Sequence, residues 1–103
     1  MILNKKIGMV ILNYNDSETV EEYYNLIKDY HSIDRIVIVD NKSPDGSFKK
    51  LCLLNKGNVD VIQTDKNKGY SYGNNYGANY LMEHYDTDIF FISNPDVEYP
   101  ETF

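Results

Sequence analysis

Four short apolar runs divide this chain, and each of them stops abruptly at a polar turn. The runs cover residues 7–12, 36–39, 59–62 and 89–92. The first, second and fourth are apolar at successive positions rather than at alternate ones. This pattern is typical of strands that are buried on both faces of a parallel sheet. We therefore predict four strands, three of them without a solvent-exposed face.

Helical patterns lie between the four runs. Apolar residues recur at helical spacing after the first run, a short segment that begins at Ser47 follows the second, and a longer segment over residues 71–84 follows the third. The apolar positions of these segments are Val20, Tyr23, Tyr24, Ile27, Tyr30, Phe48, Leu51, Cys52, Leu54, Tyr76, Tyr80 and Leu81. The last three are expected to be buried. The order β-α-β-α-β-α-β predicts one α/β domain with a parallel sheet and helices on both of its faces.

Charge and cysteine content exclude several classes of function. The 103 residues carry a net charge of −6 and only short pairs of Lys or Arg, whereas nucleic acid binding needs a concentrated basic face. The single cysteine, Cys52, excludes an internal disulfide and is predicted to be a small core residue in a reduced compartment. No segment approaches the roughly 20 apolar residues of a membrane span, and the N-terminus lacks the apolar stretch of a secretory signal. The expected location is cytoplasmic.

The loops after the strands are the expected binding region, because ligands of open parallel sheets bind at the carboxyl ends of the strands. These loops are residues 13–17, 40–46, 64–72 and 94–98. Tyr14 can stack on a flat ligand group, or it can pack on the next helix as an ordinary surface tyrosine. Asp40 can accept hydrogen bonds from a base imide N–H or from ribose hydroxyls, or it can stabilise the turn itself. Both alternatives remain open.

Two glycines mark the segment after the third run. Gly73 and Gly77 are four residues apart, so they share one face of the predicted helix, and each costs about 1 kcal/mol relative to alanine. Such a face allows close approach either to the sheet or to the phosphates of a ligand. Lys68, in the loop before it, can reach a phosphate oxygen or remain solvated.

Asp96 follows the fourth run, in the sequence Asn94-Pro95-Asp96. Mg²⁺ and Mn²⁺ prefer carboxylate oxygens, and Mg²⁺ often bridges carboxylates and substrate phosphates. The alternative is an ordinary Asn-Pro turn. His31 and His84 have no partner at metal-ligand spacing and are expected to be structural or solvated.

Four motifs in order resemble family-2 glycosyltransferases, which have the GT-A fold. Residues 10–15 (VILNYN) are similar to the opening strand of that family, and residues 38–47 (IVDNKSPDGS) to its VDNxSxDGS segment. Residues 67–77 (NKGYSYGNNYG) resemble NxGxxxGNNxG, and residues 94–97 (NPDV) lie where the family carries an Asp-x-Asp metal motif. Together the motifs cover nearly the whole chain. The resemblance implies a Rossmann-like sheet of order 3-2-1-4.

The resemblance also implies a site for a nucleotide-sugar donor. Tyr14 would lie against the base, Asp40 would bind the base or ribose, and Asp96 would hold Mg²⁺ or Mn²⁺ on the diphosphate. The other expected donor-binding residues are Asn13, Asn67, Lys68, Gly69 and Asn74. The variant Asn-Pro-Asp resembles a branch associated with rhamnosyl transfer, which implies a UDP- or dTDP-linked sugar and a glycan or similar acceptor.

The same resemblance implies an inverting transferase whose carboxylate base lies well downstream. Because this chain ends at Phe103, we expect a single truncated donor-binding domain without a catalytic base, inactive alone and peripheral to the membrane in the full-length protein. An alternative is a non-catalytic nucleotide-binding or interaction module, for example a homodimer formed through the edge of the fourth strand. A dinucleotide-binding domain or a P-loop fits worse, since residues 13–16 contain no glycine.

Overall fold

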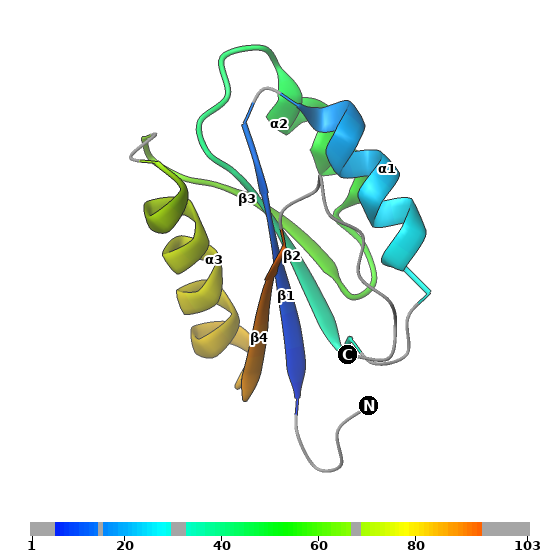
Figure 1. Cartoon of the computed structure of the whole chain (residues 1–103), viewed down its shortest axis with the longest axis vertical. Coiled ribbons are helices and arrows are strands. Elements are labelled where there is room, and N and C mark those ends of the chain that lie inside the picture. Colours follow the sequence, from blue (N-terminus) through cyan, green and yellow to red (C-terminus); the bar gives the residue numbers. More distant parts are fainter. Residues whose placement is uncertain (1–5, 15, 30–32, 67–68, 94–103) are drawn as a thin grey trace.

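The computed structural model describes residues 6–14, 16–29, 33–66 and 69–93. Strands and helices alternate along these residues (Figure 1). The strands are β1 (Ile7–Asn13), β2 (Arg35–Asp40), β3 (Val59–Gln63) and β4 (Ile89–Ser93). The helices are α1 (Ser17–Ile27), α2 (Ser47–Leu51), the short 3-10 helix η1 (Cys52–Leu54) and α3 (Tyr70–Tyr85). Every predicted strand and helix is therefore present.

The four strands form one parallel sheet in the order β3-β2-β1-β4. This confirms the predicted α/β class and the order 3-2-1-4. All residues of β1 are buried, as expected for a central parallel strand. The register pairs Asn13 with Asp40 and Asp40 with Gln63. Three polar residues thus lie side by side where β1, β2 and β3 end.

Helices cover both faces of the sheet, as predicted (Figure 1). The sheet face under α1 and α2 is formed by alternate residues of β1, β2 and β3. The opposite face packs against α3. The buried residues of the first face are Met9, Ile11, Val20, Tyr23, Tyr24, Ile27, Ile33, Ile36, Ile38, Leu51, Val59 and Val61. Those of the second face are Val10, Leu12, Val37, Val39 and Leu81. The two sets alternate along β1 and β2, so both layers depend on the same strand register.

Helix α3 lies very close to the sheet at its two glycines. A Cβ atom at Gly77 would be 2.7 Å from Val10 Cγ1 and 2.8 Å from Val39 Cγ2. A Cβ atom at Gly73 would be 2.5 Å from Leu12 Cδ1. Carbon atoms do not approach this closely without displacement. Of the two explanations for this glycine face, the structure therefore supports close packing on the sheet.

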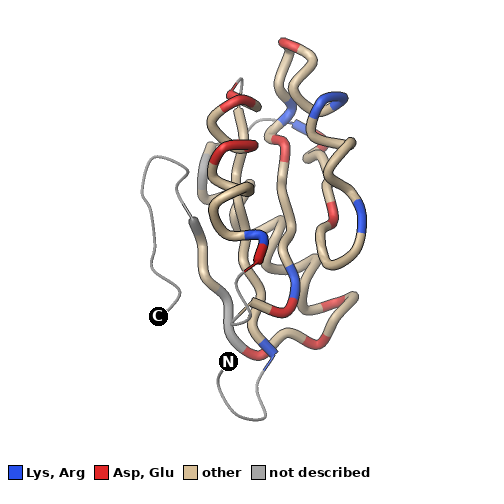
Figure 2. The backbone as a smooth tube through the Cα atoms, turned by 90° about the vertical axis from the view of Figure 1, so that its right-hand side faces the viewer, with Lys and Arg blue, Asp and Glu red and all other residues tan. Residues whose placement is uncertain are grey.

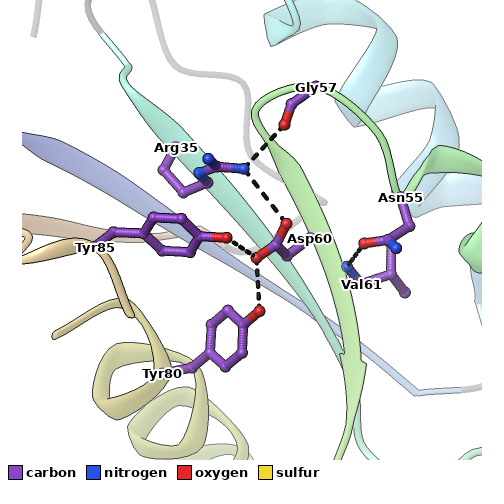
Figure 3. A network of polar contacts seen from close by, with 7 residues as sticks. All are labelled: Arg35, Asn55, Gly57, Asp60, Val61, Tyr80 and Tyr85. Carbon is purple, nitrogen blue, oxygen red and sulfur yellow. Dashed lines mark hydrogen bonds and ion pairs between the residues drawn. The ribbon is translucent and has the colours of Figure 1, made fainter. Parts of the chain in front are cut away.

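A polar network fastens the C-terminal part of α3 to the edge strand β3 (Figure 3). Asp60 Oδ2 accepts hydrogen bonds from the hydroxyls of Tyr80 (2.6 Å) and Tyr85 (2.5 Å). Asp60 Oδ1 lies 3.4 Å from Arg35 Nη1, and the Arg35 guanidinium lies 4.0 Å from the centre of the Tyr85 ring. Burial and the bond to Asp60 raise the pKa of Tyr80, and the bond to Asp60 and burial raise the pKa of Tyr85. The network joins β2, β3 and α3 far from the carboxyl ends of the strands.

This network predicts that the free energy of unfolding decreases at high pH. Because the pKa values of Tyr80 and Tyr85 are raised above their usual value of 10.0, the unfolded chain loses these protons before the folded chain does. The contribution is therefore complete below about pH 10 and is lost as the pH rises through the folded-state values. In the double variant Tyr80→Phe, Tyr85→Phe, the free energy of unfolding near neutral pH should be lower by about 2 kcal/mol. Its urea midpoint should also fall less than the wild-type midpoint at high pH; an equal fall in both would contradict this assignment.

Two predicted burials are wrong, and Tyr80 is half-buried rather than buried. Cys52 is exposed, because the preceding residue, Leu51, fills the core position and the chain continues as a 3-10 helix that turns Cys52 away from it. Tyr76 is 37% exposed, because Gly73, Gly77 and Leu81 form the face of α3 that meets the sheet. Leu81 is fully buried, as predicted. Tyr30 lies outside the described residues.

Charged side chains do not form a basic face on the described residues. Figure 2 shows Lys and Arg spread over several elements, with Asp and Glu between them. His84, one of the two histidines, is exposed, and its ring stacks on Tyr80 at a centroid distance of 4.2 Å. His84 is thus solvent-exposed and packs along α3, in line with the structural or solvated role expected for it.

Candidate functional site

The candidate site is built on the polar row Asn13, Asp40 and Gln63 at the carboxyl ends of three adjacent strands. Asn13 is 1% exposed and Asp40 is 0% exposed. A carboxylate in such a position must be compensated by hydrogen bonds, because an unpaired buried charge is very costly. The arrangement around Asp40 shows how this is achieved.

Asp40 accepts four hydrogen bonds from the residues around it. Its Oδ1 atom accepts from Asn13 Nδ2 (2.8 Å) and Ser43 Oγ (2.6 Å). Its Oδ2 atom accepts from Ser43 N (2.9 Å) and Gln63 Nε2 (2.9 Å). An ionised carboxylate has about four acceptor positions, so all of them are used in this structure. Asp40 therefore joins the ends of β1, β2 and β3 and also stabilises its own turn.

The turn after Asp40 has a strained backbone. Lys42 has a φ of 58°, a left-handed backbone conformation that residues other than glycine rarely adopt. The two bonds from Ser43 to Asp40 hold the chain in this conformation. Strained backbone of this kind is concentrated at ligand-binding sites, which agrees with a functional role for the loop.

A second network positions the start of α3 above the same edge. Asn41 donates from Nδ2 to the Gly69 carbonyl (3.2 Å) and accepts at Oδ1 from Thr64 Oγ1 (3.1 Å). Gly69 has φ of 91°, which favours glycine, and α3 begins at the next residue. The free backbone N–H groups of a helix start attract anions. The network thus brings an anion-attracting group to the edge that carries Asp40.

Two further predicted residues lie in this region. Tyr14 follows β1 and is 44% exposed, so its ring is accessible for stacking. Asn74 lies in the first turns of α3, and its Oδ1 atom is buried without a hydrogen-bond partner among the residues that the structure describes. An unsatisfied buried acceptor costs about 1–3 kcal/mol. Asn74 therefore has the capacity to accept a hydrogen bond from a ligand.

The described residues do not by themselves provide a metal site. They contain no group of three or more His, Cys, Asp or Glu side chains placed to hold a metal ion. The other carboxylates near this edge are exposed, and hydrogen bonds from Ser47 and Tyr72 lower the pKa values of Asp45 and Asp65. The predicted ligand Asp96 and its neighbour Asn94 lie outside the described residues, as do Asn67 and Lys68. The metal thus remains a prediction that depends on Asp96.

Comparison with known proteins gives a family match over most of the chain. The family model described as glycosyl transferase family 2 matches residues 9–103. The chain belongs to this family. Among curated proteins, it is 28% identical over 92 residues to the low-salt glycan biosynthesis hexosyltransferase Agl10 of Haloferax volcanii, covering 89% of this chain and 28% of that protein. It is 31% identical over 98 residues to a dolichol-phosphate mannosyltransferase of Pyrococcus furiosus, covering 92% of this chain and 27% of that protein.

Solved structures show the same fold. The mannosyltransferase PcManGT from Pyrobaculum calidifontis, solved with GDP-Man and Mn²⁺, superimposes with a TM-score of 0.72 at 18% identity, over 92% of this chain and 28% of that one. TarS 1-349 of S. aureus gives 0.64 at 24% identity, over 90% of this chain and 28% of that one. The sheet and its helices are therefore those of the Rossmann-like part of a GT-A fold. This family-2 chain spans just over a quarter of the length of these relatives.

Three of the residues that build the site were not predicted individually. Gln63, Ser43 and Thr64 make the bonds that hold Asp40 and Asn41. Ser43 and Thr64 lie in two of the predicted binding loops, and Ser43 is the serine of the VDNxSxDGS segment, whereas Gln63 is the last residue of β3. The register of the sheet is what reveals Gln63, because it pairs Gln63 with Asp40 across two strands. Among the described residues, no helix of this family-2 domain is long and apolar enough to cross a membrane.

Proposed function

We propose that this chain binds the nucleotide-diphosphate sugar donor of a family-2 glycosyltransferase. The observation that carries the proposal is the row of Asn13, Asp40 and Gln63, which ends beside the start of α3. A carboxylate able to bind a base and helix amides able to bind a diphosphate lie on the same edge of the sheet. The family membership gives this edge its expected ligand.

The residues have separate roles in the proposed site. The exposed ring of Tyr14 stacks on the base, and Asp40 accepts a hydrogen bond from the base or ribose. Asn67, Lys68 and Gly69 lie near the diphosphate, where the start of α3 contributes a positive potential. Asn74 accepts a hydrogen bond from the donor through its unpartnered Oδ1 atom. The donor is UDP- or dTDP-linked in this proposal, although the PcManGT structure contains GDP-Man.

A divalent cation completes the proposed donor site. Asp96 would hold Mg²⁺ or Mn²⁺ against the diphosphate, and PcManGT was solved with Mn²⁺. Such an ion stabilises negative charge on a leaving diphosphate. The acceptor would be a glycan and the reaction would invert the anomeric centre. None of the described residues is assigned as the base, so donor binding, rather than transfer, is the activity proposed for these 103 residues.

Donor binding can be tested by calorimetry with UDP in the presence and absence of Mn²⁺. We expect measurable binding that weakens at least about tenfold without the metal or in Asp96→Ala, since the diphosphate loses its counter-charge. Tyr14→Ala should weaken UDP binding by about fivefold or more in either condition, because base stacking does not involve the metal. Asn79→Ala, an exposed change on α3, should have no effect. Absence of UDP binding in both conditions would contradict the proposal.

The homodimer expected from the sequence has partial support. Among the strands that the structure describes, β4 has a neighbour on one side only, and Ile92 in this strand is 50% exposed. An unpaired strand edge with an exposed apolar side chain favours association with another chain. Dimerisation through β4 therefore stays a prediction.

A further inference from the structure

Gln63 differs from the other partners of Asp40. Asn13 is buried, and Ser43 is fixed by its place in the strained turn and donates partly through its backbone N–H. Gln63 is half-buried, has a long flexible side chain and comes from β3, which is last in the sheet order. Of the two donors on Asp40 Oδ2, the Ser43 backbone N–H and the Gln63 amide, only the Gln63 amide can leave without moving backbone.

A ligand N–H can reach Asp40 only by exchange. Both acceptor positions of Oδ1 are taken by Asn13 Nδ2 and Ser43 Oγ, and those of Oδ2 are taken by Ser43 N and Gln63 Nε2. Because a carboxylate only accepts, it is the amide NH₂ of Gln63 that faces Asp40. Replacing this donor by another N–H conserves the number of hydrogen bonds on the carboxylate, so the exchange is energetically possible.

We propose that Gln63 occupies the base-binding position on Asp40 Oδ2 and that base binding displaces it. This inference rests on the proposed donor site. One acceptor position becomes available, while Oδ1 remains engaged by Asn13 and Ser43. A uracil or thymine base has a single N–H between two carbonyls on its pairing edge, which matches one available acceptor. Guanine presents two neighbouring donors on that edge, and one of them is left without a partner on Asp40. The engaged Oδ1 atom thus selects a base with one imide N–H, and that N–H takes the place of the Gln63 amide on Oδ2.

The exchange predicts that Gln63→Met, a variant of similar size without the amide, binds UDP more tightly than the wild type rather than more weakly. UDP should bind about fivefold more tightly than to wild type, since it no longer displaces a hydrogen bond to a charged group. A residue that only contacted the base would give the opposite result. Asn79→Met, on the exposed face of α3, is the matched control and should bind UDP like wild type. Unchanged or weaker UDP binding by Gln63→Met would overturn the proposal.

Nucleotide analogues test the same exchange in the wild-type chain. GDP should bind at least about tenfold more weakly than UDP, because an unpaired donor costs about 1–3 kcal/mol. The side-chain amide resonances of Gln63, followed by NMR, should shift on saturation with UDP but not with N3-methyl-UDP, which lacks the imide N–H. If UDP binds and these resonances stay in place, or if GDP binds as tightly as UDP, the inference fails. If UDP does not bind at all, the proposed function itself fails.

Discussion

Replacement of Asp40 by alanine is expected to lower the free energy of unfolding by about 4 kcal/mol. The substitution removes the common acceptor of Asn13, Ser43 and Gln63, and leaves buried donors without partners. For a domain of this size the melting temperature should fall by roughly 20 °C. Urea denaturation followed by circular dichroism measures the change directly. The effect is large because one side chain joins three strand ends.

Asp45→Ala is the matched control for this prediction. Asp45 is an exposed carboxylate in the same loop, and its hydrogen bonds reach only Ser47. A much smaller loss of stability is expected for this variant, because its carboxylate connects no strands. Equal urea midpoints for the two variants would refute the structural role of Asp40. Since Asp40→Ala is partly unfolded in this view, the role of Asp40 in base binding is better tested through Gln63.

Substitution of Gly77 by leucine is expected to be about as damaging, at about 4 kcal/mol or more. Even the first carbon of the new side chain would lie 2.7 Å from Val10 and 2.8 Å from Val39. Valine is β-branched and rigid at χ1, so neither neighbour can turn aside, and α3 must move away from the sheet. Thermal unfolding of the variant measures the cost.

A graded series separates this packing effect from helix propensity. Gly77→Ala should cost about 1–2 kcal/mol, because the steric cost exceeds the gain of about 1 kcal/mol in helix propensity. Gly73→Ala should cost less, although its contact with Leu12 Cδ1 is shorter, because the end of a leucine side chain can move. Asn79→Ala, exposed on the same helix, should be neutral or slightly stabilising. A stabilising effect of Gly77→Ala would contradict the close packing.

The fold was largely predictable because each strand is a short apolar run with a polar stop. The runs gave the strand ends to within one residue, and the alternation with helices gave a parallel sheet. Burial was harder to predict on helices that are short or contain glycine. Cys52 and Tyr76 are apolar by type, yet they are exposed because Leu51 and the glycine face of α3 occupy the core positions. Periodicity alone does not determine which of several apolar residues faces the sheet.

The candidate site was predictable in its location but only partly in its chemistry. Asp40 was expected at the tip of a strand, and it lies there. Its complete set of four hydrogen bonds was not expected, because those bonds depend on which residue of β3 lies beside it. That neighbour, Gln63, is 23 positions away in the sequence. Pairing between distant strands is fixed by register, which local patterns do not report.

The close contact between α3 and the sheet also sets a dimension of the proposed ligand site. Gly73 lies near the start of α3, so the thickness of the helix–sheet layer there determines how far the helix N–H groups stand from the end of β2. A base held at Asp40 and a diphosphate held at the helix start would be two parts of one molecule with a limited reach. A bulkier residue at Gly73 would move the start of α3 away from the sheet. A single donor molecule would then reach Asp40 or the helix N–H groups, but not both.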